Sequence, residues 1–187
     1  MITLVSLWLP ILLSALIVFI ASSVIHMVLG YHKYDWKQVP GQGDVMQSLR
    51  NFKIPPGDYM LPCPDTPGQM NTPEFKALAD QGPRITMTVL PGGQSSMVKN
   101  LVFWFIYCIV VSKFAGYVAS VVLATGTPYI TVFRITSVVA FAGYALAHWQ
   151  STVWYSRSLG TTLRNTLDGL IYALLTGGVF GWLWPHA

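Results

Sequence analysis

The stretch LVSLWLPILLSALIVFIASSVIHMVLG, residues 4–30, contains no Asp, Glu, Lys or Arg. As an α-helix it would extend about 40 Å, which exceeds the roughly 30 Å hydrocarbon layer of a bilayer. We therefore predict a membrane-spanning helix that tilts or protrudes from this layer. The stretch is too long for the core of a signal peptide and has no basic segment before it, so we expect it to be retained.

Three further apolar runs follow, at residues 101–125, 129–149 and 167–184, and each has about the length that a span requires. The short connector Gly126-Thr127-Pro128 predicts a tight helical hairpin between the first two of these runs. Only 10% of the 187 residues are charged and 53% are hydrophobic, whereas about a quarter are charged in a soluble domain. The predicted fold is therefore a membrane all-α protein, a bundle of four transmembrane helices.

A polar segment rich in Pro and Gly lies between the first and second runs. It divides the chain into transmembrane helix 1 (residues 1–30), a polar insert (31–99) and transmembrane helices 2–4 (100–187). Because the insert is too small to bury a full core alone, we expect it to lean on the membrane surface, on the spans or on a partner.

Within this insert the pattern predicts a small α+β structure. We expect one short helix to be capped by Asp44, and a second to be capped by Thr72 and followed by Gly82. Residues 59–61 and 84–90 predict two short strands.

The basic residues predict the orientation. Of 11 Lys and Arg residues, most lie in the connectors after the first and third spans: Lys33, Lys37, Arg50, Lys53, Lys76, Arg84, Lys99, Arg157 and Arg164. The positive-inside rule places these connectors in the cytoplasm and both termini outside. Because the basic residues are scattered singly, they indicate topology and no nucleic-acid partner.

Small residues recur at four-residue spacing along three of the spans, and the glycines among them are Gly116, Gly143, Gly169, Gly177 and Gly181. In lipid, small residues let helices approach closely enough for dispersion contacts to accumulate. We expect these glycines to pack the four helices against one another; a homodimer contact is the alternative.

Two cations, Lys113 and Arg134, lie inside predicted spans, where charge is expensive. Either they serve a function or they extend to the interface along their aliphatic stems. The chain offers no Asp or Glu at this depth. We expect the counter-charge to come from the terminal carboxylate of Ala187, a lipid phosphate or an acidic group of another subunit.

A second polar layer is predicted at the cytoplasmic edge from His26, His148 and Asp168, which belong to three different spans. Two facing histidines could ligate a haem or a metal, with Asp168 orienting one ring. The alternative is ordinary hydrogen bonding at the interface, and no cofactor is otherwise indicated.

Cys63 and Cys108 lack the spacing of a zinc site.

Four stretches carry a resemblance: FIASSVIHMVL (19–29), KNLVFWFIYCIVVS (99–112), FAGYALAHWQSTVWYSR (141–157) and NTLDGLIYALLTGGVFGWLWP (165–185). They resemble a family of short, uncharacterised four-span proteins of the bacterial inner membrane. The resemblance implies a bacterial inner-membrane location and assigns a role to no residue.

No GxSxG, HExxH or GxxxxGK[ST] motif occurs, so the sequence favours a protein that is not an enzyme. The leading hypothesis is a non-catalytic integral membrane subunit or scaffold of a larger inner-membrane complex, with lipids and other membrane subunits as partners. The alternative is a transporter or channel component for a small anionic solute, attracted by Lys113 and Arg134. A third is a haem- or metal-binding electron carrier that uses His26 and His148.

Overall fold

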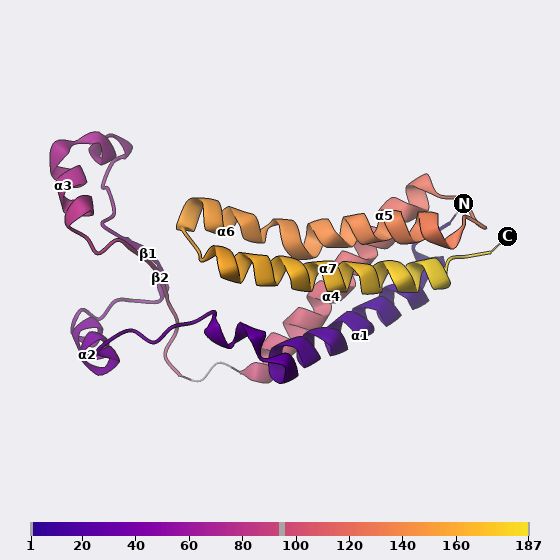
Figure 1. Ribbon diagram of the computed structural model, residues 1–187, viewed down its shortest axis with the longest axis horizontal. Helices are drawn as coiled ribbons and strands as arrows, with labels where there is room; N and C mark the ends of the chain where they lie inside the picture. The colour runs from indigo at the N-terminus through magenta and orange to yellow at the C-terminus, as the bar shows by residue number, and fades with distance from the viewer. Residues whose placement is uncertain (1, 94–95, 187) are drawn as a thin grey trace. The chain divides into compact units, whose positions relative to one another are not determined.

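The computed structural model describes residues 2–93 and 96–186 of the chain. The chain folds into two compact units, one formed by Met1–Lys37 together with Ser96–Ala187 and the other by Gln38–Ser95. The first unit contains the long helices and the second contains a small sheet with two short helices (Figure 1).

The long helices of the first unit are interrupted rather than uniform. Helix α1 (Trp8–Val24) follows a short 3-10 turn and continues as a π-helical segment, Ile25–Leu29. Helix α4 spans Met97–Val122, and the side chain of Ser96 caps it by accepting a hydrogen bond from the backbone N–H of Lys99. The remaining elements are α5 (Tyr129–Phe141), a second π-helical segment (Ala142–Leu146), α6 (His148–Tyr155) and α7 (Leu159–Trp182).

Among the residues that the structure describes, three continuous helical stretches are long and apolar enough to cross a membrane: Val5–Leu29, Met97–Val122 and Tyr129–Tyr155. They coincide with the first three predicted spans and support a membrane protein. Most of the fourth predicted span, residues 167–184, lies in α7, which ends at Trp182, and this span stays a prediction.

Helix α7 begins at Leu159, eight residues before the apolar run that predicted it at residue 167. Its polar first turns are helical because tertiary contacts satisfy their side chains. The hydroxyl of Thr162 lies 2.5 Å from that of Thr152 in α6, and Thr161 donates to Asp35. Because the helix begins this early, Asp168 lies well inside it rather than in its first turn.

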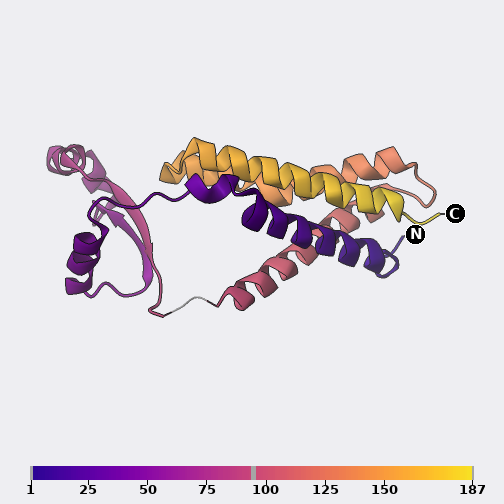
Figure 2. The ribbon, with the colours of Figure 1, turned by 60° about the horizontal axis from the view of Figure 1, so that its bottom comes forward.

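Each of the four long helices packs on two others: α1 contacts α4 and α7, and α5 contacts α4 and α7 (Figures 1 and 2). Glycines lie at these contacts. A Cβ atom added at Gly169 would come within 2.7 Å of the Cβ of Ala145, and one at Gly181 within 2.7 Å of the Tyr129 ring. Gly177 packs more closely still, because a Cβ atom there would overlap the Ser137 hydroxyl of α5. Helices α5 and α7 approach this closely because α7 has no side chain at these positions.

Gly116 and Gly143 lie at looser contacts. A Cβ atom at Gly116 would lie 3.1 Å from the ring of Phe180, and one at Gly143 would lie 3.0 Å from Val111. In both cases the nearest atoms belong to side chains, whereas the α5–α7 contact also involves backbone.

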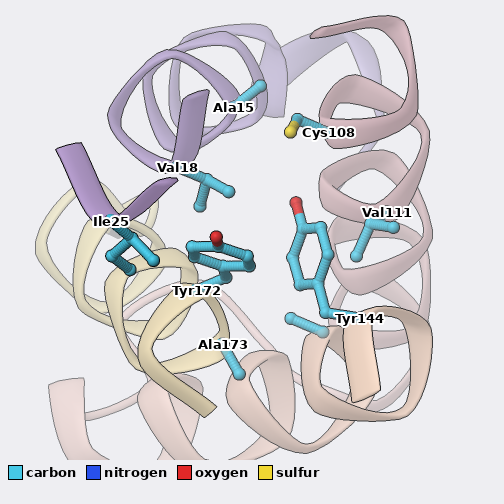
Figure 3. Packing of buried hydrophobic residues seen from close by; sticks show 9 residues of the cluster. Ala15, Val18, Ile25, Cys108, Val111, Tyr144, Tyr172 and Ala173 are labelled. Atoms are coloured by element: carbon cyan, nitrogen blue, oxygen red, sulfur yellow. The ribbon is translucent and has the colours of Figure 1, made fainter. Parts of the chain in front are cut away.

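Two buried apolar clusters fill the space between the helices. One contains Leu7, Ile11, Ala119, Val132, Phe180 and Trp184. The other contains Ala15, Val18, Ile25, Cys108, Val111, Ala140, Tyr144, Tyr172 and Ala173, and most of these are drawn in Figure 3. The backbone N–H of Gly126 donates to the carbonyl oxygen of Pro185 at 2.9 Å, which ties the α4–α5 turn to the end of α7.

In the second unit, strand β1 (Gly57–Leu61) pairs with β2 (Ile85–Val89) in antiparallel fashion, with Gly57 opposite Val89. Both strands were predicted within a few residues of these bounds. The unit also contains α2 (Gln42–Asn51) and α3 (Pro73–Gln81).

The two short helices differ in how they begin. The Thr72 hydroxyl accepts a hydrogen bond from the N–H of Phe75 at 3.2 Å, which confirms the predicted cap of α3. The predicted cap of α2 is wrong, since Gly41 occupies that position and Asp44 lies in the first turn. Gly41 adopts a φ of 63°, which glycine tolerates without strain. The helix therefore begins at Gln42, before Asp44. No residue of either helix is buried.

Candidate functional site, a polar cluster around His32

The segment after α1 turns sharply at Gly30, which has a left-handed φ of 63° that glycine adopts without strain. A short 3-10 helix, Tyr31–Tyr34, follows immediately. This turn carries Tyr31, His32 and Asp35 onto the N-terminal half of α7. Side chains that are more than 120 positions apart in the sequence therefore meet in one cluster.

His32 lies between two carboxylates. Its Nδ1 is 2.7 Å from Oδ2 of Asp35, and its Nε2 is 2.8 Å from Oδ2 of Asp168. The side chains of Asp35 and Asp168 are only 8% and 5% exposed, and that of His32 is 12% exposed. A buried carboxylate is costly unless it is paired, so His32 connects two groups that each need a donor.

Asp35 has further donors besides His32. Its Oδ1 accepts hydrogen bonds from Nε of Arg164 at 2.8 Å and from the Thr161 hydroxyl at 3.1 Å, and it forms an ion pair with Nη2 of Arg164. Burial by itself would raise the pKa of Asp35. The hydrogen bonds from His32, Arg164 and Thr161, together with the positive charge of Arg164, outweigh burial and hold this pKa below its usual 3.8.

Tyr31 donates its hydroxyl to Oδ1 of Asp168. Burial, this hydrogen bond and the negative charge of Asp168 all raise the pKa of Tyr31. The phenol therefore stays protonated at neutral pH and remains a donor, which fixes the orientation of the Asp168 carboxylate.

His26 completes the cluster from the π-helical segment. Its ring stacks on that of His32 with centroids 4.5 Å apart and planes 5° from parallel, and its Nδ1 lies 3.0 Å from the carbonyl oxygen of Ser22. His26, His32 and Asp168 each offer a possible metal-ligand atom, and these three atoms lie within 4.8 Å of one another. This is an arrangement of two imidazoles and one carboxylate, with Asp35 behind one imidazole.

An aromatic layer lies next to this cluster within the helical unit. Trp104 donates from Nε1 to the Ser22 hydroxyl at 2.7 Å, and its ring contacts those of Tyr144 and Tyr172. The hydroxyl of Tyr144 points toward Cys108 (Figure 3). Tyr172 lies one helical turn after Asp168, and both Tyr31 and Trp104 pack against the apolar cluster that contains it.

The sequence predicts a polar layer formed by His26, His148 and Asp168. The structure brings His26 and Asp168 together, but His148 is exposed at the start of α6 and does not belong to the cluster. His32 is the second histidine instead. The span pattern does not predict its role, because His32 lies in the basic connector after the first span. The signal that could have found it is the three-residue spacing of His32 and Asp35, which suits a helical hydrogen bond.

Lys113 and Arg134 are both exposed, on α4 and α5 respectively. Within residues 2–93 and 96–186 neither takes part in a recorded ion pair. One partner expected for them, the terminal carboxylate of Ala187, lies outside the described residues.

Comparison of the chain with family models, with curated proteins and with solved structures found no match.

Proposed function

We propose that this protein is a non-catalytic integral membrane subunit, or scaffold, of a larger complex in the bacterial inner membrane. The observation that carries the proposal is the exposure of Lys113 and Arg134 on helices whose other exposed side chains are largely apolar. A cation facing hydrocarbon is costly, and an acidic group on a neighbouring subunit would remove that cost. Lipid phosphate is the competing partner, and the experiment below separates the two.

The proposed topology has four spans, with α7 as the fourth. The outward side chains of α7 support this, because Leu163, Leu167, Leu170 and Leu174 are all at least 43% exposed. A contiguous apolar stripe of this kind is unfavourable in water and favourable in lipid. The basic connectors support a cytoplasmic location for residues 31–99 and an external location for both termini.

The polar insert supports a role in binding other subunits. The apolar side chains of α2, Val45, Met46 and Leu49, are each about 40% exposed. They form one face of a helix that buries none of its residues. A partner protein or the membrane surface would cover this face.

The alternative of an anion transporter receives less support. Lys113 and Arg134 point away from the packed interior of the helical unit, so a path lined by both would have to run between several copies of the chain. Within the part of the chain that the structure describes, the interior is filled by the two apolar clusters.

Native mass spectrometry of the protein extracted gently from its own membranes tests the proposal. We expect the wild type to appear in a larger assembly and the variant Lys113→Met, Arg134→Met to lose most of it. Lys99→Met is the matched control, because Lys99 lies in the first turn of α4 and should reach the interface. Monomeric wild type, or an assembly unchanged in the double variant, would exclude the proposed role for these cations.

A further inference from the structure

We infer that His26, His32 and Asp168 form a binding site for one divalent metal ion such as Zn²⁺ or Fe²⁺. This inference goes beyond the proposed role as a membrane subunit and does not depend on it. It rests on the donor set, on the groups that orient the donors and on the accessibility of His26.

The donor set suits such an ion. Imidazole nitrogen and carboxylate oxygen are common ligands of zinc and of non-haem iron, at about 2.0–2.2 Å from the metal. Two ligands on a tetrahedral ion are then roughly 3.4 Å apart. In this protein the three ligand atoms lie within 4.8 Å of one another, so a displacement of about 1 Å or a little more would bring them to a shared ion.

Groups outside the donor set already orient two of the ligands. Asp35 lies 2.7 Å from Nδ1 of His32, which directs the Nε2 of that ring toward Asp168. Arg164 and Thr161 hold Asp35 in turn, and Tyr31 holds Asp168. Histidine ligands of metals usually donate their other N–H to a carboxylate or a backbone carbonyl in this way.

His26 follows the same pattern, with a carbonyl in place of the carboxylate. Its Nδ1 lies 3.0 Å from the carbonyl oxygen of Ser22, which leaves Nε2 as the free ring nitrogen. The residue belongs to a π-helical segment, and such segments occur frequently at functional sites.

Metal binding requires two rearrangements. Nε2 of His32 and Oδ2 of Asp168, now 2.8 Å apart, must separate slightly to admit the ion, and the ring of His26 must turn. The rings of His26 and His32 are parallel here, so their planes do not converge on one point. His26 is exposed, and its recorded hydrogen bond is to the backbone of its own helix. Turning this ring about its Cβ–Cγ bond would give up that hydrogen bond and the stacking on His32, whereas moving His32 or Asp168 would disturb several partners of each.

The test uses the full-length protein in detergent, purified with a tag that contains no histidine and treated with a chelator. Titration with Co²⁺ alone should give one visible absorption band that saturates at one ion per chain, and Zn²⁺ should displace it. His26→Gln should weaken Co²⁺ binding at least tenfold. His148→Gln, which changes an exposed histidine outside the cluster, should leave binding unchanged.

Circular dichroism of each metal-free variant establishes that it is folded, and His26→Gln is chosen because His26 makes few contacts. A wild type that gives no saturating Co²⁺ band overturns the inference. Equal weakening in His26→Gln and His148→Gln also overturns it, because the binding would then belong to scattered surface histidines.

Discussion

The close contact between α5 and α7 predicts different effects for two neighbouring substitutions. In Gly177→Ala the new Cβ atom would lie 2.8 Å from the backbone carbonyl oxygen of Phe133 and would overlap the hydroxyl of Ser137. The Ser137 side chain can rotate, but the carbonyl moves only if α5 moves. In Gly178→Ala the nearest atom would be the Tyr129 hydroxyl at 3.8 Å, an ordinary contact.

The magnitude follows from comparing the two variants. Alanine favours a helix over glycine by about 0.8–1.0 kcal/mol, and both variants share this gain. Only Gly177→Ala overpacks the interface, which costs about 1–3 kcal/mol in a well-packed core. We therefore expect the free energy of unfolding to be about 1–3 kcal/mol lower for Gly177→Ala than for Gly178→Ala.

Unfolding in mixed micelles with increasing sodium dodecyl sulfate, followed by far-UV circular dichroism and tryptophan fluorescence, measures this difference. If the two variants unfold at the same detergent fraction, or if Gly177→Ala is the more stable, the helices are not in the close contact described and the packing argument fails.

Three further substitutions test other contacts. Asp35→Asn removes the ion pair that holds Arg164, and the same unfolding assay should show a loss of about 1–3 kcal/mol; no loss would mean that the pair is not formed. Ser14→Ala removes the 3.0 Å bond to the Ser112 hydroxyl and should cost about 0.6 kcal/mol, well below the effect of Gly177→Ala. Thr72→Ala removes the cap of α3 and should speed amide exchange in residues 73–81 about fivefold, for a cost of about 1 kcal/mol. Thr66→Ala, at a helix start where no side-chain cap bond forms, should leave that exchange unchanged.

Part of the candidate site could be predicted from the sequence. His26 and Asp168 were grouped correctly because their depth in the predicted spans follows from the length of each apolar run. His148 was grouped with them by the same estimate. Depth alone does not determine which way a side chain points around its helix, and His148 is exposed.

His32 and Asp35 could not be assigned to the site by periodicity, because they lie after the helix ends. Their positions depend on the left-handed turn at Gly30 and on contacts with Thr161 and Arg164, far away in the sequence. The early start of α7 depends on the same contacts. A hydropathy pattern records only how apolar a segment is, so it cannot show polar residues that are buried by pairing with one another.

The amino-acid sequence alone predicted four apolar segments long enough to cross a bilayer, of which three are found as helices of that length and character, and two short strands between the first two segments. Both follow from short-range properties: the length of an apolar run, and the alternation of residues in a strand. Only the tertiary structure decided that α7 reaches back to Leu159 and that His32 lies between Asp35 and Asp168. Such pairings join distant parts of the chain, and they form only when packed helices remove these carboxylates from water.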